Sequence, residues 1–254
     1  MRCGTWLGAA GMAAGLLAAP GLRAENAVVE AAKALAAKPS YAWTATPQDA
    51  AAGGAESGRR GGRGGGPIEG RTEKNGFTVL SMKSGETTVE GVLKGDKVVV
   101  KSGDAWKTPE EFAGGAGGAP QDGNRPQRDP AQFMARRLRA FRLPAAEAED
   151  LADKAAGLKA EGDAIVGELP ESVVRELLAF GRGRGGDAPA VAGAKGSVSF
   201  WVRDGVLVKY QVALQGSVTF GDRQIDLKRT TVTEIKEIGT AKVDVPDAAK
   251  QKLP

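Results

Sequence analysis

The sequence SVSFWVRDGVLVKYQVAL, residues 197–214, decides the fold. Two runs rich in valine and aromatic residues flank the dipeptide Asp204-Gly205. Such runs favour strands, and Asp-Gly favours a type I′ turn because both central residues of that turn need a positive φ. The stretch therefore predicts a β-hairpin. A further long strand over 224–238 and a short terminal helix from Pro246 are expected to follow it.

Apolar residues are predicted on both faces of this hairpin. Successive side chains of a strand alternate between its two faces. One face then carries Trp201, Val208, Tyr210, Val212 and Leu214, and the other carries Val198, Phe200, Val202 and Leu207. A sheet with two apolar faces is expected to be covered on more than one side, by helices or by its own curvature.

Residues 68–108 predict an antiparallel meander. Ser84-Gly85 and Gly95-Asp96 are the expected two-residue turns. They would set Leu80 opposite Val89 and Leu93 opposite Val98, on one face with Met82 and Val100. The other face is mostly charged, but it also aligns Phe77, Val92 and Val99. We therefore expect one packed face and one wet face that is partly covered.

The remaining elements follow from periodicity and from helix-starting residues. Val28, Ala32 and Leu35 form one apolar stripe, which predicts a short amphipathic helix over 27–37. We expect a first strand over 41–46, helices over 131–141, from Pro144 and over 171–180, and a strand over 158–169. Glu147, Glu149 and Asp150 fall near the start of the helix from Pro144, where they predict a solvated face.

Three glycine-rich inserts interrupt this pattern, at about 48–67, 113–129 and 181–195. They cannot bury apolar surface, so they are expected to be loops. Their arginines, Arg59, Arg60, Arg63, Arg182 and Arg184, resemble those of RNA-binding Arg-Gly segments but lack interleaved Phe or Tyr. We expect no specific nucleic acid. An alternative function is an envelope interaction or scaffold protein that uses these arginines on anionic surfaces.

The amino terminus predicts export. Arg2 precedes an uncharged apolar run over 6–19, and Ala24 offers a small residue at a cleavage point. The run is shorter than the roughly 20 residues that span a bilayer. Residues 1–24 are therefore interpreted as a signal peptide, and the periplasm or the extracellular space as the destination. Cys3 precedes the apolar run, whereas a lipoprotein signal carries its cysteine after it, so no lipid anchor is expected.

The residue inventory excludes several kinds of chemistry. The chain has no histidine, and Cys3 is its single cysteine. Ser-His-Asp and Cys-His nucleophile systems, histidine-ligated zinc and thiolate metal sites are excluded on that ground. No other catalytic motif stands out, and we predict a non-enzyme without cofactor or metal.

The order of elements resembles the exported LolA/LppX-like carriers. The local support is the run from Phe200 to Gly205 with Lys209-Tyr210, then Glu237 to Thr240 leading to Val245-Pro246. The resemblance implies a half-open barrel covered by helices that shelters acyl chains.

These observations together predict one α+β domain over 25–254. Its core would be a strongly curved antiparallel sheet, a half-open β-barrel, with helices packed on one side. The predicted function is non-catalytic binding of a lipid or another apolar small molecule between sheet and helices. The candidate cavity residues are Leu80, Val89, Leu93, Val98, Val100, Trp201, Val208, Tyr210, Val212 and Leu214.

Overall fold

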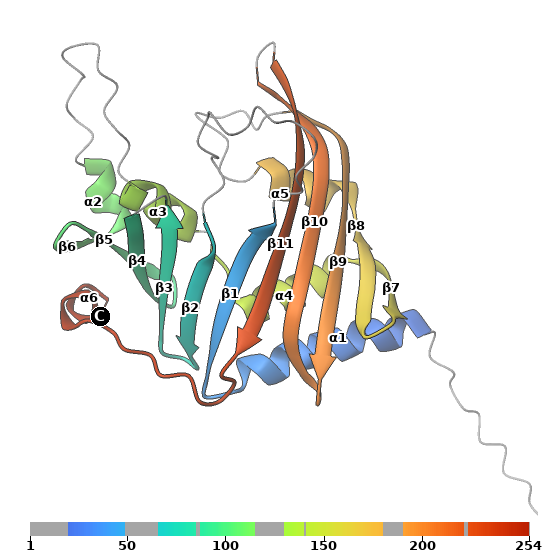
Figure 1. Cartoon of the computed structure of the whole chain (residues 1–254), viewed down its shortest axis with the longest axis horizontal. Helices are drawn as coiled ribbons and strands as arrows, with labels where there is room; N and C mark the ends of the chain where they lie inside the picture. Colours follow the sequence, from blue (N-terminus) through green and yellow to red (C-terminus); the bar gives the residue numbers. More distant parts are fainter. Residues whose placement is uncertain are drawn as a thin grey trace, which may run out of the picture.

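A computed structural model describes residues 20–48, 66–84, 87–114, 130–139, 141–179, 190–220 and 223–253. Its centre is one antiparallel sheet in the order β6-β5-β4-β3-β2-β1-β11-β10-β9-β8-β7 (Figure 1). The strands are β1 (Ser40–Gln48), β2 (Ile68–Glu73), β3 (Phe77–Ser84), β4 (Thr87–Lys94), β5 (Lys97–Ser102), β6 (Ala105–Lys107), β7 (Ala156–Glu161), β8 (Ala164–Leu169), β9 (Ala190–Arg203), β10 (Val206–Phe220) and β11 (Arg223–Lys236).

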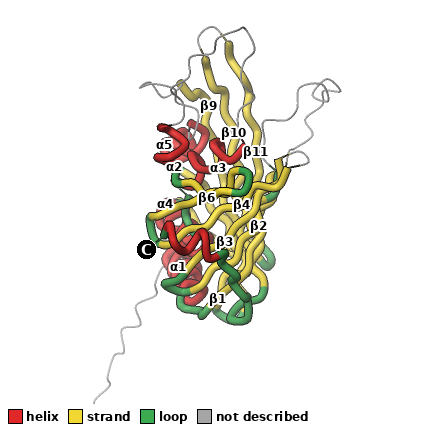
Figure 2. Tube along the Cα trace, turned by 90° about the vertical axis from the view of Figure 1, so that its left-hand side faces the viewer, coloured by secondary structure: helices red, strands yellow, loops and turns green. Residues whose placement is uncertain are grey.

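The sheet is a chain of neighbouring hairpins with one long-range joint. Strands that are consecutive in sequence pair with each other, except β6 and β7, and β1 also pairs with β11, from Ala42↔Lys236 to Gln48↔Thr230. The sheet bends strongly between its two arms (Figures 1 and 2). It is open, however, because β6 and β7 are its edges and do not pair with each other. The predicted curved antiparallel α+β fold is confirmed, without closure into a barrel.

The hairpin that decides the fold is confirmed, but its predicted faces are wrong. Asp204 and Gly205 have φ angles of 51° and 72°, as a type I′ turn requires. Leu207 pairs with Val202, and the next pair is Lys209↔Trp201, so Val208 is the extra residue of a β-bulge. One extra residue reverses the alternation beyond it. Tyr210, Val212 and Leu214 therefore lie on the same face as Val198 and Phe200, and Tyr210 lies opposite Phe200.

The meander is confirmed with one shift of register. Leu93 pairs with Val98 as predicted. Leu80, however, pairs with Gly91, and Val89 pairs with Met82, so each β3 residue pairs two residues further along β4 than predicted. A shift of two in the pairing keeps every side chain on its predicted face. It also puts Gly91 under a helix, where an added Cβ would lie 2.8 Å from Leu138 Cδ1.

Four helices cover one face of the sheet, which we call the inner face. They are α1 (Pro20–Ala36), α3 (Pro130–Leu138), α4 (Pro144–Lys154) and α5 (Glu171–Ala179). Helix α1 packs on β7, β9 and β10, α3 on β4 and β5, and α5 on β9 and β10. The predicted α1 stripe is confirmed, because Val28, Ala32 and Leu35 are all fully buried.

The opposite, outer face has a smaller core of its own. Val92 and Val99, the row predicted on the wet face, are fully buried there. They pack with Trp106 from β6 and with Val245, Ala249 and Leu253 from the chain's end. The end is helix α6 (Asp247–Lys252), which lies on this side of the sheet, so the helices are not confined to one side. A short helix α2 (Pro109–Gly114) follows β6.

Other predicted boundaries change. Residues 158–169 were predicted as one strand, but they form most of the hairpin β7–β8, which turns at Gly162 with a φ of 64°. Strand β9 begins at Ala190, within the predicted third insert. The five insert arginines lie outside the described residues. Within the described ranges, no helix is long and apolar enough to cross a membrane.

Candidate functional site

Three aromatic residues form the middle of the inner face. Tyr41 and Trp43 project from β1, and Tyr210 projects from β10, with exposed fractions of 3%, 2% and 1%. We call them the aromatic floor. The floor lies between the arm covered by α3 and the arm covered by α1 and α5. Each of its residues contacts the start of α4 or the short segment before that helix.

Trp43 is held between a glycine and an aromatic ring. Gly70 of β2 pairs with Trp43, and a Cβ on Gly70 would lie 2.2 Å from two carbons of the indole. The indole therefore rests on bare backbone. On its other side Phe141, which links α3 to α4, stacks with centroids 5.4 Å apart and planes inclined by 21°. The indole Nε1–H donates a hydrogen bond to Thr72 Oγ1 over 3.2 Å, which satisfies its polar atom.

Tyr210 donates a hydrogen bond from its hydroxyl to Glu147 Oε2 of α4. Glu147 is half-buried as a whole residue. Its carboxyl group points inward, because it contacts Tyr210, which is almost wholly buried. Burial raises the pKa of Glu147 above its ordinary value, against the lowering effects of Tyr210, Arg137 and Arg142. The prediction of a solvated acidic face is therefore wrong for Glu147, because this side chain points toward the sheet.

Tyr41 fixes the start of α4 from another side. Burial raises the pKa of Tyr41 to about 12, while hydrogen bonds with the backbone of Ala145 and the hydroxyl of Thr72 act in the opposite direction. The phenol is therefore neutral at physiological pH. Thr72 also accepts a hydrogen bond of 3.2 Å from Thr78, so the polar atoms of this region satisfy one another.

Helix α4 meets its neighbours through small side chains. Its buried residues are Pro144, Ala145, Ala148, Leu151 and Ala152. It lies beside α1, whose buried stripe is Val28, Ala31, Ala32 and Leu35. Alanine buries little apolar area, so each such contact stabilises the docked helix less than a leucine or phenylalanine contact would. The attachment of α4 to the sheet therefore depends on the aromatic floor.

The structure divides the predicted cavity residues into three groups. Leu80, Val89, Leu93, Val98 and Val100 are buried on the inner face of the β3–β5 arm. Tyr210, Val212 and Leu214 lie on the inner face of β10 and belong to the same core. Val208 occupies the bulge, and Trp201 lies on the outer face opposite Lys209. The Lys209 ammonium lies 4.0 Å from the centre of the Trp201 ring, a cation–π contact.

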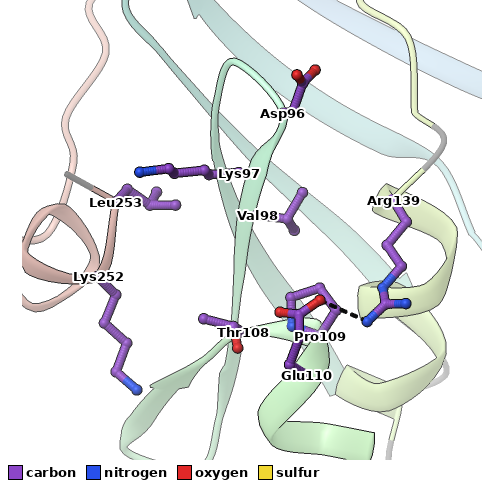
Figure 3. Close-up of a pocket in the computed structure, with 9 residues that line it drawn as sticks. All are labelled: Asp96, Lys97, Val98, Thr108, Pro109, Glu110, Arg139, Lys252 and Leu253. Carbon is purple, nitrogen blue, oxygen red and sulfur yellow. Dashed lines mark hydrogen bonds and ion pairs between the residues drawn. The ribbon is translucent and has the colours of Figure 1, made fainter.

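Side chains of α3 and α5 fill the inner face above three glycines of the sheet. Methyl groups of Val174, Leu178 and Leu138 press on Gly196, Gly216 and Gly91, within 3.0 Å of where a Cβ would be. The best-defined hollows of the described chain lie elsewhere. One of about 380 Å³ lies between α6, β5, α2 and α3, where Arg139 pairs with Glu110 (Figure 3). One of about 450 Å³ lies at the far ends of β9–β11, which project beyond the helices (Figure 2).

Sequence reasoning missed most of the aromatic floor. Tyr41 was assigned only to a first strand, Trp43 was not among the candidate cavity residues, and Glu147 was assigned to solvent. The signal that could have found them is the alternation Tyr41-Ala42-Trp43 in a strand without charged residues, which is typical of a central strand. For Glu147, the signal is its spacing of i, i+4 with Leu151, which puts it on the buried side of α4. In the described ranges, no group of three acidic or other metal-ligating residues could hold a metal ion.

No protein-family model and no curated protein matches the chain. Among solved structures it is similar to lipoprotein LppX from Mycobacterium tuberculosis, with 14% identity, a TM-score of 0.47 and coverage of 89% of this chain and 99% of that chain. It is also similar to LprF from Mycobacterium bovis, with 13% identity, a TM-score of 0.43 and coverage of 91% and 100%. Both similarities are similarities of fold.

Proposed function

We propose that this chain is an exported, non-catalytic protein of the cell envelope that binds a lipid or another apolar ligand between its inner face and α4. The observation that carries the proposal is the continuous apolar surface of the inner face, which joins both arms of the sheet in one core. Helices α1, α3 and α5 also cover this surface, and α4 covers its centre, so the proposed site lies beneath α4.

The ligand takes the place of α4 over the aromatic floor. Side chains of α3 and α5 press on the sheet to either side of the floor, and α4 covers the floor itself, so uptake requires this helix to lift. Few large contacts oppose this lifting. Helix α4 is attached to α1 mainly through alanines, and to the sheet through Ala145, Glu147 and the preceding Phe141. The exposed residues are then Tyr41, Trp43 and Tyr210, rigid aromatic surfaces with hydroxyl or N–H groups at their edges.

Export remains part of this proposal. The predicted cleavage point Ala24 lies in α1 and is partly buried against the core. Cleavage after it would remove the first turn of that helix and leave Val28, Ala32 and Leu35 in place. Amino-terminal sequencing of the protein recovered from the envelope fraction tests this step. An intact terminus at Met1 would contradict it.

Lipid binding is tested by two measurements on the purified chain. Lipids are extracted and identified by mass spectrometry, and binding of a dansylated fatty acid is followed by fluorescence titration. The variant Trp43→Phe removes part of the floor, and Trp201→Phe makes the same substitution on the outer face. We expect Trp43→Phe to weaken probe binding at least about fivefold, equal to roughly 1 kcal/mol, and Trp201→Phe to leave it unchanged. Absence of co-purified lipid together with non-saturable probe binding would refute the proposal.

A further inference from the structure

We propose that the Glu147–Tyr210 contact is a proton-controlled latch: α4 stays docked while the Glu147 carboxyl is protonated and is released when that carboxyl ionises. The geometry behind this is a carboxyl that crosses from the covering layer to the sheet. Glu147 belongs to the first turn of α4, and its partner Tyr210 is 1% exposed in the middle of the sheet. The inference rests on the proposed function, because it names what controls access to the same site.

An ionised carboxyl is costly at this position because the surroundings are apolar. Tyr210 lies beside Phe200, with ring centroids 6.5 Å apart, and α1 faces α4 with its apolar stripe. Burying a charge in such surroundings costs more than its hydrogen bonds return unless it has a close counter-charge. The neutral carboxyl fits the docked position, whereas the ionised one gains by moving into water.

The charges around Glu147 do not cancel that cost. Arg137 of α3 and Arg142 of the segment before α4 attract the ionised form, and Asp150 on α4 repels it. Arg142 is exposed and already pairs with Asp150 over 2.9 Å. Arg137 is exposed as a whole residue, but burial of its guanidinium lowers its pKa, so it is itself partly desolvated. The start of α4 also favours a negative charge through its dipole. Burial outweighs all of these, and the pKa of Glu147 is raised.

The raised pKa of Glu147 sets the direction in which pH changes the docking of α4. The docked state holds the Glu147 proton more tightly than a lifted state in which the carboxyl is hydrated. Docking is therefore most stable below the ordinary glutamate pKa of 4.5. It weakens as the pH rises above that value, until the docked carboxyl is itself ionised. Each unit by which docking raises the pKa corresponds to about a tenfold gain in the opening equilibrium constant.

Hydrogen–deuterium exchange of the full chain without ligand measures the opening. Protection of residues 144–154 is followed from pH 5 to pH 8.5 and corrected for intrinsic exchange at each pH. We expect protection of this segment to fall at least about tenfold over the range, while α5 keeps its protection. Glu147→Gln, which retains size and hydrogen bonding, should abolish the fall. Asp153→Asn, which removes an exposed carboxyl from the same helix, should retain it.

Tyr210→Phe is a second test, in which the pH-dependent fall in protection should be shifted and not abolished. Its hydroxyl stabilises the ionised carboxyl, so its removal should shift the midpoint of the fall to higher pH. A pH-independent wild type, or a Glu147→Gln variant that titrates as the wild type does, would overturn the latch. Because these measurements need no ligand, they can fail while lipid binding stands. A working latch in a protein that binds no lipid would instead refute the proposed function alone.

Discussion

The ring of Phe141 stacks on the indole of Trp43, so the segment that leads into α4 is fastened to the central strand of the sheet. The indole in turn lies on Gly70, without a side chain between them. Three segments far apart in the sequence thus meet in one vertical stack. The stack fixes where α4 begins. Its loss is therefore expected to displace the start of α4 from the candidate site.

Replacing Phe141 tests this stack. Phe141→Ala is expected to lower the free energy of unfolding by about 2 kcal/mol, below the 3–5 kcal/mol typical of fully buried phenylalanines because this ring is half-buried. Phe141→Leu, which keeps most of the bulk, should cost less than about 1.5 kcal/mol. Urea denaturation followed by tryptophan fluorescence measures both. Equal losses for the two variants would mean that aliphatic bulk cannot replace the ring, and no loss in either variant would mean that the stack contributes nothing.

Gly70 is expected to be the least replaceable glycine of the inner face. In Gly70→Ala the new Cβ would meet the indole at 2.2 Å, and a ring pinned between β2 and Phe141 cannot move aside. We expect a loss of about 3 kcal/mol. Gly91→Ala is the matched control, because its Cβ meets the flexible ends of Leu138 and Met134, and it should cost about 1 kcal/mol. Thermal unfolding ranks the two, and the reverse ranking would contradict this account.

The bulge at Val208 sets the faces of β10. Deleting Val208 would restore regular pairing and leave Tyr210 opposite Phe200, because Leu207↔Val202 and Lys209↔Trp201 become consecutive pairs. We therefore expect the deletion variant to keep a cooperative unfolding transition. Val208→Ala, which keeps the residue count, should also fold and lose less than about 1.5 kcal/mol. Circular dichroism during heating follows both variants. Loss of the cooperative transition in the deletion variant would contradict this account of the bulge.

The chain's end is predicted to stabilise the outer core. Leu253 is 1% exposed, and Lys94 donates a hydrogen bond to its carbonyl over 3.3 Å. Leu253→Ala should therefore lower the free energy of unfolding by about 2 kcal/mol. Lys250→Ala, at an exposed position of the same helix, should change it by less than about 0.5 kcal/mol. Denaturant titration provides both values, and indistinguishable variants would mean that α6 is only loosely attached.

The sequence predicted the elements of the fold well because their signals are local. Asp204-Gly205 dictates a turn, and the stripe of Val28, Ala32 and Leu35 dictates the buried side of α1. The row Phe77, Val92 and Val99 likewise indicated cover on the outer face, although the covering segment, α6, lies about 150 residues further along the chain.

The failures have a common physical origin. The bulge at Val208 and the β3–β4 register depend on what the opposite layer needs, and no local signal encodes them. A regular hairpin is the correct expectation from the turn alone, yet it put Trp201 on the wrong face. The inward position of Glu147 depends on Tyr210, 63 residues away. The site was therefore less predictable than the fold that holds it.

The pairing of β1 with β11 governs how this protein can be made. Strands β2 to β6 and β7 to β10 form by hairpins between neighbours, which a growing chain can assemble as it emerges. The two arms join only through β1, which can pair with β11 only after residues 223–236 have been synthesised. Until then the strand that carries Tyr41 and Trp43 has an open edge. Any machinery that moves the chain during translation therefore handles two unjoined halves, and the sheet is completed only afterwards.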